Sequence, residues 1–379
     1  MSKIVVAMDS FKGSISSFEA CKIIQNKLYE HFPDSDIVSL PLADGGEGTV
    51  DCLLYYFNGK KNYLTVNNPL FEKINTYYGL FKNNHTAFIE VAKCIGQPLI
   101  EERKNPLITS SYGVGEMIKS ALDNGCKEII ISLGGACTND GATGAMCALG
   151  FEFYNMNDEK FIPTGCNLGE IKNIHTENVD KRIYSTKFVT FSDVSNPLYG
   201  DLGATKVFSP QKGATPEMIK LLEENMIKYA ELIENFFKIN NLNDLPGGGA
   251  SGGLGAGLYA FLNSKIEMGS TMLLKYIEFD KKIDKANLII TGEGKLDIQS
   301  MNGKLVGGIC NYAKSKNIPV IVLTGGFEKK DFDFYSNGIA AVFTINQLPE
   351  TLSICMKQTT NNLEITIDNI LRAIKKVSL

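Results

Sequence analysis

Histidine is scarce in this sequence, which has only His31, His85 and His175 among its 379 residues. All three lie outside the motifs described below, so we expect neither a histidine-dependent catalytic triad nor a zinc site. No two of the nine cysteines form a Cys-x-x-Cys pair, and their number is odd. We therefore expect no disulfide framework, but reduced and mostly buried thiols in a cytoplasmic protein.

Long apolar runs and long basic runs are also missing. No stretch approaches the ~20 apolar residues that a membrane span needs, and Lys3–Met8 is too short for a leader segment. Without a basic run, and with a net charge of −4, a nucleic-acid partner is not expected. The sequence does have 44% apolar and 21% charged residues, which indicates a packed globular protein. Its 379 residues are too many for one typical core, so we expect two domains. We expect small-molecule partners and either a monomer or a homodimer.

The hydrophobic pattern begins as alternating strands and helices. Lys3–Met8 is an apolar strand, and Ser16 and Glu19 form a capping box for a helix that runs to about His31. A second strand at 36–40 leads into a glycine-rich stretch and another helix. This β-α-β-α order predicts a parallel sheet.

The pattern changes near residue 62 and reverts near residue 286. Predicted strands lie at 62–66, 74–80, 86–91, 128–133, 187–191, 288–291, 320–324 and 340–344, and predicted helices at 114–122, 140–149, 216–237, 250–262 and 363–377. The first three of these strands are typical of hairpins. We predict an α/β fold of two domains, a discontinuous one made of 1–62 plus 286–379 and an inserted one at 63–285.

A strand followed by glycines and an acidic or amide residue recurs three times, at 43–49, 134–141 and 291–297. In open α/β sheets, ligands bind beyond the carboxyl ends of the strands. Glycines there let the backbone approach a ligand, and the N–H groups at the next helix start attract anions. A single loop of this kind is as easily an ordinary tight turn, but three that carry carboxylates indicate a phosphate and metal site.

Other polar residues also follow predicted strands. Ser10, Lys12 and Ser14 offer a cradle for an anionic group, with Lys12 as the point charge. Asp193 follows a buried strand, which suits Mg²⁺ binding or acceptance of a hydroxyl proton, although it also suits a simple turn. Lys212 stands beside a glycine just before a helix N-terminus, a place suited to a phosphate.

Several familiar signatures are absent. There is no Gly-x-x-x-x-Gly-Lys-[Ser/Thr], which excludes a P-loop kinase, and no His-Arg-Asp or Asp-Phe-Gly, which excludes a protein kinase. Residues 247–252 match Gly-x-Gly-x-x-Gly literally, but the stretch before them is polar and does not resemble a strand. We therefore interpret 250–262 as a closely packed small-residue helix, not as a dinucleotide-binding fingerprint.

In their order and spacing, the motifs closely resemble one family, the bacterial type I glycerate kinases. The stretches that carry the resemblance are DSFKGS at 9–14, PLADGGEGT at 41–49, IEVAKCIG at 89–96, RKNPLITSSYGVGE at 103–116, LGGACTNDGATG at 133–144, DVSNPLYGDLGATKVFSPQKGAT at 193–215, PGGGASGGLGAGL at 246–258 and ITGEGKLDIQS at 290–300. No single stretch is specific, but the whole series is.

The resemblance implies a kinase that uses ATP and Mg²⁺ to phosphorylate D-glycerate, with 2-phosphoglycerate as the product and 3-phosphoglycerate left open. It also implies a Rossmann-like parallel-sheet domain and a flavodoxin-like α/β domain, with the active site in the cleft between them. Two other functions stay open. One is an NAD-dependent hydroxy-acid dehydrogenase. The sequence argues against it, because it has no acidic residue about 20 positions after Gly252. The other is a non-catalytic glycerate-binding sensor, which the density of carboxylates and lysines at strand ends argues against.

Phosphoryl transfer needs positioning and charge neutralisation more than covalent chemistry, and we assign candidate roles on that basis. Asp44 is the first candidate to receive the substrate hydroxyl proton and Asp193 the second, while Asp193 and Asp297 are the candidate Mg²⁺ ligands. The cations predicted to neutralise phosphates or the glycerate carboxylate are Lys12, Lys212, Lys295 and Arg103. The other predicted substrate- or phosphate-binding residues are Ser10, Ser14, Gly45, Gly46, Gly134, Gly135, Asn139 and Glu293.

Overall fold

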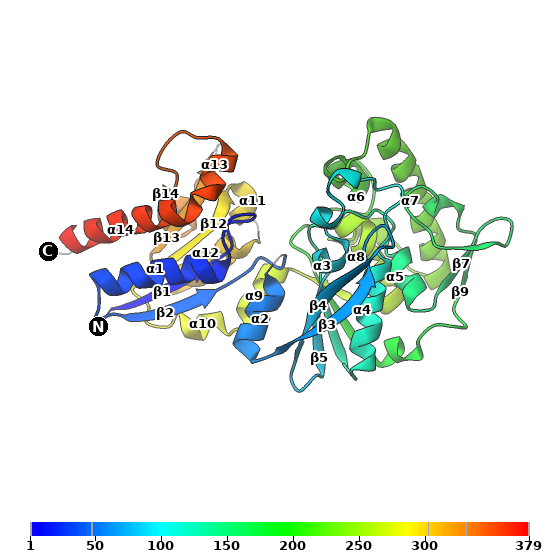
Figure 1. Ribbon diagram of the computed structural model, residues 1–379, viewed down its shortest axis with the longest axis horizontal. Helices are drawn as coiled ribbons and strands as arrows, with labels where there is room; N and C mark the ends of the chain where they lie inside the picture. The colour runs from blue at the N-terminus through cyan, green and yellow to red at the C-terminus, as the bar shows by residue number, and fades with distance from the viewer. Residues whose placement is uncertain (1, 47, 302, 330–331, 378–379) are drawn as a thin grey trace. The chain divides into compact units, whose positions relative to one another are not determined.

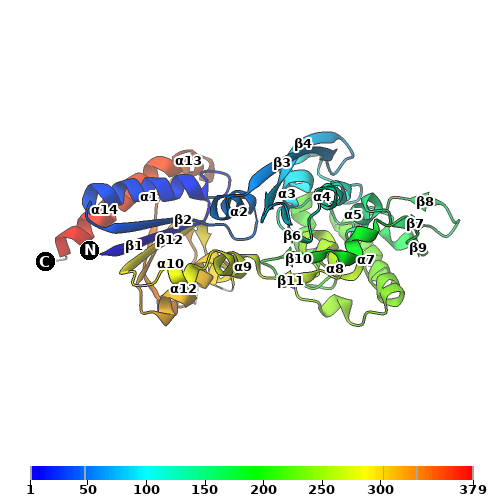
Figure 2. The same ribbon diagram turned by 90° about the horizontal axis from the view of Figure 1, so that it is seen from below.

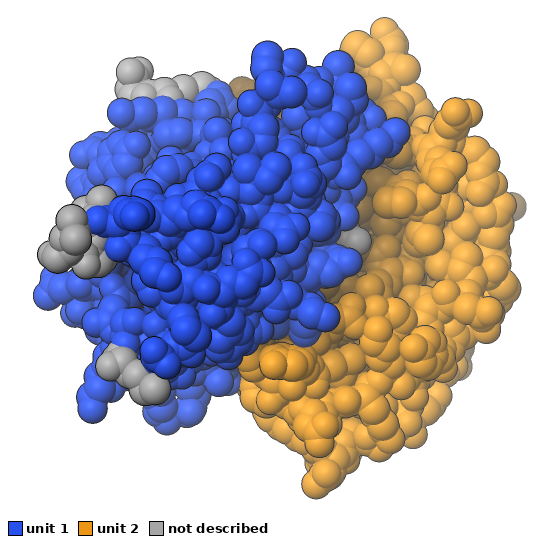
Figure 3. Space-filling view, turned by 60° about the vertical axis from the view of Figure 1, so that its left-hand side comes forward, with its two compact units in different colours: residues 1–44, 270–379 blue, residues 45–269 orange. Residues whose placement is uncertain are grey.

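The computed structural model describes residues 2–46, 48–301, 303–329 and 332–377, so position 47 of the motif at 41–49 lies outside the described residues. The chain forms two compact units, which Figure 3 colours separately. Unit 1 consists of residues 1–44 and 270–379, and unit 2 of residues 45–269. Unit 1 is therefore discontinuous in sequence.

These boundaries differ from the predicted ones, which followed residues 62 and 285. Helix α2 (Thr49–Phe57) belongs to unit 2, where Val50 N donates a 2.6 Å hydrogen bond to the buried Glu90 Oε1. Helix α10 (Phe279–Lys282) belongs to unit 1, where the Phe279 ring packs edge-on against Tyr312. The strand pattern alone does not reveal which sheet such a flanking helix covers.

Unit 1 is built on a five-stranded, fully parallel sheet. Its strands are β1 (Lys3–Met8), β2 (Asp36–Pro41), β12 (Leu288–Leu296), β13 (Val320–Phe327) and β14 (Ile339–Thr344), in the spatial order β2-β1-β12-β13-β14. Numbered within the unit, this order is 2-1-3-4-5, which is typical of flavodoxin-like sheets. It is a doubly wound parallel sheet, as predicted, but it does not have the 3-2-1-4-5-6 order of the Rossmann sheet.

Helices cover both faces of this sheet, as Figures 1 and 2 show. The helices of unit 1 are α1 (Ser17–His31), α9 (Gly269–Tyr276), α10, α11 (Ile298–Met301), α12 (Leu305–Ser315), α13 (Leu352–Lys357) and α14 (Thr359–Val377). The predicted capping box of α1 is confirmed, because Ser16 and Glu19 cap each other's backbone. On the face covered by α1 and α14, Ile24 and Leu363 share a buried cluster with Val6 of β1.

Unit 2 is built on a six-stranded mixed sheet, and a short second sheet accompanies it. The strands of the large sheet are, in spatial order, β3 (Lys60–Asn67), β4 (Lys73–Phe81), β5 (Thr86–Glu90), β6 (Glu128–Ser132), β10 (Lys187–Phe191) and β11 (Lys265–Glu267). The pairs β3–β4 and β4–β5 are antiparallel, as the predicted hairpins require, and the other pairs are parallel. The short sheet, which was not predicted, contains β7 (Glu152–Tyr154), β8 (Lys160–Phe161) and β9 (Asn173–His175).

The helices of unit 2 are α2, α3 (Ala92–Ile95), α4 (Tyr112–Asp123), α5 (Thr143–Ala148), α6 (Ala204–Phe208), α7 (Pro216–Phe237) and α8 (Ala250–Leu262). The prediction for α7 is confirmed, whereas α8 is interrupted near its start, because Ser251, Gly252 and Gly253 have positive φ values of 53°, 70° and 83°. The helix predicted at 140–149 begins only at Thr143, because Gly141 and Ala142 have positive φ values of 57° and 75°. Those two residues turn the chain before the helix can start.

All nine cysteines are free thiols, as predicted, and burial raises the pKa of Cys137 to about 12. Among the described residues, no helix is both long enough and apolar enough to cross a bilayer.

Candidate active site

A cavity of about 750 Å³ lies at the carboxyl edge of the unit 1 sheet. The strand order reverses between β1 and β12, and such a switch point opens a crevice beyond the strand ends. The residues that line it include Asp44 after β2, Asp9, Ser10, Lys12 and Ser14 after β1, Glu293, Gly294 and Lys295 on β12, Asp297 after it, Gly325 and Gly326 on β13, and Asn346 after β14. The volume lies within the range of small-molecule pockets.

Three carboxylates gather at the end of this cavity formed by β2, β1 and β12. Asp9 and Asp44 are buried, and burial together with the charge of Asp44 raises the pKa of Asp9 well above its usual range, against the opposing effect of Lys12. Burial also raises the pKa of Glu293 to about 7, and its Oε1 has no hydrogen-bond partner among the described residues. Mutual repulsion, and the absence of a donor to Glu293 Oε1 among the described residues, make this cluster a place where a cation would be favourable.

Lys12 supplies positive charge to the cluster. Its Nζ lies 2.5 Å from Asp44 Oδ2, and its side chain is 58% exposed. A tight turn presents it, because Ser14 N and Ile15 N both donate to Phe11 O and Gly13 has a φ of 74°. An exposed ammonium beside a buried carboxylate is well placed to contact an incoming anion as well.

The segment 291–297, predicted as a glycine loop after a strand that ends at residue 291, is mostly strand. Strand β12 continues beyond 291 to Leu296, because it pairs with β13 as far as Phe327. Lys295 forms ion pairs with Glu328 Oε2 at 2.6 Å and with Asp297 Oδ2 at 3.6 Å. Asp297 also caps α11, since its Oδ1 accepts a 2.9 Å hydrogen bond from Gln299 N. The extension brings Gly294 of this motif to the wall of the cavity.

The acid cluster fits a divalent cation that is shared with a ligand. Within the part of the chain that the structure describes, no three or more His, Cys, Asp or Glu side chains form a group that could hold a metal ion. Mg²⁺ usually takes one or two carboxylates together with substrate phosphates and water. The unpartnered Glu293 Oε1 and the crowded Asp9 and Asp44 offer that kind of partial site. Of the two predicted ligands, Asp297 lines this cavity and Asp193 belongs to unit 2.

In unit 2, the carboxyl ends of the parallel strands bring together a second set of predicted residues. The Ser132 hydroxyl at the end of β6 donates a hydrogen bond to Gly45 O. A Cβ on Gly45 would lie 3.3 Å from Asp193 Oδ2, and one on Gly134 would lie 3.6 Å from Gly46 Cα. The loops after β6 and β10 and the start of unit 2 are therefore neighbours, and Gly135 belongs to the first of them.

Lys212 and Asn139 have internal partners. Lys212 is only 1% exposed, its Nζ donates a 2.8 Å hydrogen bond to Thr138 O, and burial lowers its pKa to about 8. Asn139 Nδ2 donates to Thr205 Oγ1, and Asn139 Oδ1 accepts from Ser209 Oγ, both at 3.3 Å. The structure thus gives both side chains internal partners that hold the loop after β6.

Arg103 forms a bidentate ion pair at the surface. Its Nη1 and Nη2 lie 2.6 and 2.9 Å from the two carboxylate oxygens of Glu72. Hydrogen bonds from Arg103, and then from Asn68, lower the pKa of Glu72 to about 2. We predicted from the sequence that Arg103 binds a phosphate or the glycerate carboxylate. To do so, Arg103 would have to give up its ion pair with Glu72.

Asp9 and Asn346 are among the lining residues of the unit 1 cavity that were not predicted as site residues. Asp9 directly follows β1, as Asp44 follows β2, so the strand-end argument could have found it. Asn346 follows β14 and lies in no recognised motif, so no pattern in the sequence pointed to it.

The literal glycine match at 247–252 is not a dinucleotide-binding loop. A 3₁₀-helix, Leu242–Asp244, precedes it where a strand would be required. A Cβ on Gly252, which has a φ of 70°, would lie 2.1 Å from Thr138 O. Close packing against the loop after β6 explains why residue 252 is a glycine. The match to Gly-x-Gly-x-x-Gly at 247–252 therefore does not support a dehydrogenase.

A parallel α/β sheet with a nucleotide-sized cavity, a lysine and clustered carboxylates at its carboxyl edge defines an enzyme of the phosphotransferase type. The comparison with known families agrees with this class. The chain belongs to the glycerate kinase family, whose model matches residues 4–375.

Relatives resemble the chain over nearly its full length. A glycerate kinase of Bacillus cereus is 41% identical over 97% of both chains, and the glycerate 2-kinase of Escherichia coli K12 is 38% identical over 99% of this chain and 97% of its own. A crystal structure of a proposed glycerate kinase 2 from Salmonella typhimurium LT2 has a TM-score of 0.85 and 38% identity, and covers 100% of this chain and 99% of its own.

Proposed function

We propose that this kinase transfers the terminal phosphoryl group of ATP to a hydroxyl of D-glycerate, with Mg²⁺, and that the product is 2-phosphoglycerate. The observation that carries the proposal is the cavity of unit 1, where Lys12 and the carboxylates of Asp9, Asp44 and Glu293 meet in a nucleotide-sized space. Family membership supports glycerate as the acceptor. The name of the Escherichia coli relative supports the 2-position.

Lys12 and Asp44 are the proposed central pair. Phosphoryl transfer spreads negative charge over the moving group, and an ammonium stabilises that charge more strongly in the transition state than before it. Asp44 accepts the proton of the attacking hydroxyl, and Asp193 is the second candidate. The ion pair between Lys12 and Asp44 keeps both side chains oriented until substrate arrives.

Mg²⁺, when bound, neutralises phosphate charge and orients the transferred group. Asp9 and Glu293 would hold it from unit 1, and Asp297, which lines the same cavity, remains a candidate ligand as Asp193 does in unit 2. Ser10, Ser14 and Lys295 also line the cavity and are proposed to contact phosphates. Gly45, Gly46, Gly134 and Gly135 of unit 2 are proposed to approach the substrate through their backbones.

An assay that couples ADP release to a spectrophotometric signal tests the function. With D-glycerate, ATP and Mg²⁺ present, we expect ADP release that stops when any one of the three is omitted. A ³¹P NMR spectrum of the product distinguishes attachment at the 2-position from attachment at the 3-position. Absence of ADP release with D-glycerate would overturn the proposal, and a 3-phosphoglycerate spectrum would overturn its regiochemistry alone.

A further inference from the structure

The cavity of unit 1 has two chemically different ends, and their positions follow from the strand order. The carboxyl ends of β2, β1, β12, β13 and β14 succeed one another along it. Neighbouring strands lie about 4.8 Å apart, so these five ends span roughly 19 Å. The acid end, at β2, β1 and β12, holds Lys12 and the three carboxylates. The other end, at β14 and α13, holds Ile345, Asn346, Leu352, Cys355 and Met356, and we call it the base end.

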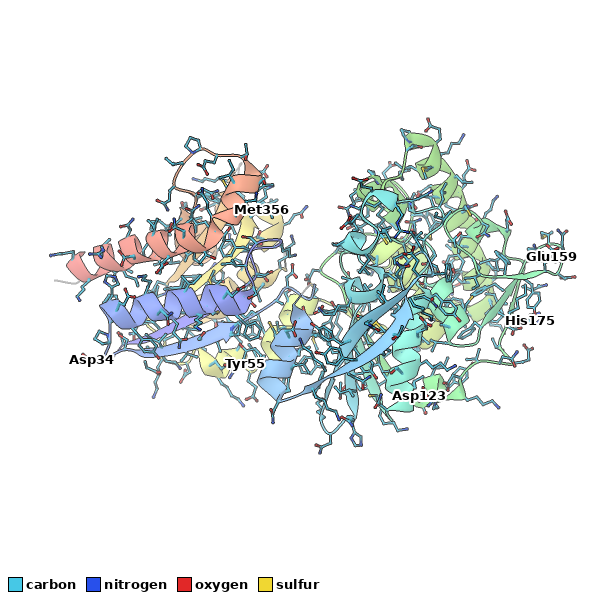
Figure 4. All side chains as sticks on the ribbon, in the orientation of Figure 1. Asp34, Tyr55, Asp123, Glu159, His175 and Met356 are labelled. Atoms are coloured by element: carbon cyan, nitrogen blue, oxygen red, sulfur yellow. The ribbon has the colours of Figure 1, made fainter. Side chains whose placement is uncertain are left out.

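Helix α13 lines the base end with Leu352, Cys355 and Met356. Met356, which Figure 4 labels, has its carbonyl oxygen 2.5 Å from the Ser14 Oγ that donates to it. Its Cε would lie 2.8 Å from a Cβ on Gly13, so the side chain packs against the loop after β1. The base end is therefore a built, largely apolar compartment beside a charged one.

We propose that the nucleotide lies along this edge, with its adenine in the base end and its phosphates over Gly294 and Gly326 toward Lys12; the inference rests on the proposed function. Glycerate has three carbons, two hydroxyls and a carboxylate, so an apolar compartment gives it nothing to bind. Adenine is the one large, flat, apolar group among the proposed substrates.

The two glycines between the ends support the path of the phosphates. A Cβ on Gly294 would come no closer than 3.7 Å to Lys12 N, and one on Gly326 no closer than 3.9 Å to Lys295 Cγ. Neither glycine has a positive φ, so neither packing nor backbone conformation requires it among the described residues. The room beside them lies in the cavity, where a side chain would occupy the space of a ligand.

Asn346 is positioned to read the base. Its Nδ2 donates a 2.6 Å hydrogen bond to Gly325 O, which fixes the amide and makes Oδ1 the remaining acceptor. The exocyclic amine of adenine is a donor, whereas guanine has a carbonyl oxygen at the corresponding position. Asn346 therefore favours ATP over GTP.

The base end is tested with a matched pair of leucines. Leu352 lines the cavity and is 76% exposed, and Leu348 is 66% exposed and does not line it. In Leu352→Asp, a carboxylate replaces an apolar contact, and we expect the KM for ATP and the Kd for a fluorescent ADP analogue to rise about tenfold. The KM for glycerate should change less than twofold, and Leu348→Asp should change none of these constants.

The phosphate path is tested with Gly326→Ala. The free protein has room for this methyl group, so we expect an unchanged melting temperature together with a rise of about tenfold or more in the Kd for the ADP analogue. Asn346→Leu should lower the preference for ATP over GTP by about tenfold. An unchanged ADP affinity in both Leu352→Asp and Gly326→Ala, or a rise confined to the KM for glycerate, would overturn the inference.

Equilibrium binding of the ADP analogue keeps this test separate from that of the function. If the wild type turns over glycerate and the variants bind ADP normally, the assignment of the base end fails and the proposed function stands. If the wild type binds no adenine nucleotide at all, both fail together.

Discussion

The two units bury carboxylates in opposite surroundings. In unit 1, Asp9 lies beside Asp44 and Glu293, and their negative charges add to the cost of its burial. In unit 2, Asp140 is fully buried, but its Oδ2 accepts hydrogen bonds from the Ser111 backbone and hydroxyl and from Gly144 N, at 2.7, 2.9 and 3.3 Å. The carboxylates of unit 1 lie close enough to raise one another's pKa, whereas Asp140 of unit 2 has three donors around one of its two oxygens.

We interpret the carboxylates of unit 1 as ligand-binding groups and the Asp140 carboxylate of unit 2 as a structural group. Donors around Asp140 tie the start of α4 to the start of α5, which is a structural task. In the free protein the charges of the crowded acids of unit 1 are only partly balanced, by Lys12 and by the Ser10 backbone N–H, and a bound cation would balance them further. Substitutions in the two clusters should therefore have opposite consequences for stability and for activity.

The largest effect on stability is expected from Asp140→Ala. Removing the carboxylate leaves the buried Ser111 N and Gly144 N without their acceptor and opens a void, which should cost about 3 kcal/mol of unfolding free energy. Urea unfolding followed by circular dichroism measures the loss. Asp140→Asn keeps one acceptor oxygen and should lose clearly less. A loss below about 1 kcal/mol in the alanine variant would show that this cluster does not hold the fold.

The next effect is on activity, in Lys12→Ala. We expect kcat/KM to fall by about 10²-fold or more, because the ammonium stabilises transition-state charge. The melting temperature should hardly change, since the Lys12 side chain is 58% exposed. Lys27, on α1, is paired with Glu30 in the same unit, so Lys27→Ala is the matched control and should keep full activity. Near-normal kcat/KM in Lys12→Ala would remove Lys12 from the chemistry.

Glu293→Gln is expected to raise the unfolding free energy, by less than Asp140→Ala lowers it. The pKa of Glu293 is about 7 in the folded protein against 4.5 in the unfolded chain, so the native state binds more protons between these values. Wild-type stability from this group thus falls as pH rises from 4.5 to 7. The variant should gain about 1–2 kcal/mol over the wild type at pH 8 and nothing near pH 4, while losing activity.

The control for that experiment is a carboxylate with the opposite shift. Hydrogen bonds from Ser16 lower the pKa of Glu19, so Glu19→Gln should lower stability at pH 8 instead of raising it. Thermal melts at pH 4 and pH 8 compare the two variants with the wild type. A stability loss at pH 8 in Glu293→Gln would mean that its charge is already satisfied in the free protein.

Local elements of this fold could be predicted because their signals are local. The Ser16 capping box, strand Lys187–Phe191 and helix Pro216–Phe237 each follow from residues within the element, and the structure confirms all three. The meeting of Lys12 and Asp44 at one sheet edge also follows from sequence, since parallel strands present their carboxyl ends together.

The remaining features depend on contacts between distant segments. Nothing near Lys212 in the sequence indicates that Thr138 would bury it, and nothing near Arg103 points to Glu72 as its partner. Strand β12 runs past its glycines only because β13 pairs with it, whereas the isolated sequence has the composition of a turn. A site residue can thus be placed at a strand end from sequence, but its partners require the fold.

The comparison between the units can be sharpened through Lys212, the buried cation of unit 2. Its pKa is about 8 in the folded protein against 10.5 in the unfolded chain, so above pH 8 the unfolded state binds more protons and stability from this group rises with pH. The wild type should gain about 1 kcal/mol between pH 8 and pH 9 relative to Lys212→Met, which has no proton to lose. Urea unfolding of both proteins at the two pH values measures the difference. If the unfolding free energies of the two proteins change with pH in parallel, Lys212 stays charged and its ammonium has more partners than the Thr138 carbonyl. If the unfolding free energy of the wild type rises more steeply with pH, the pKa of Lys212 is lowered by its burial against the loop after β6.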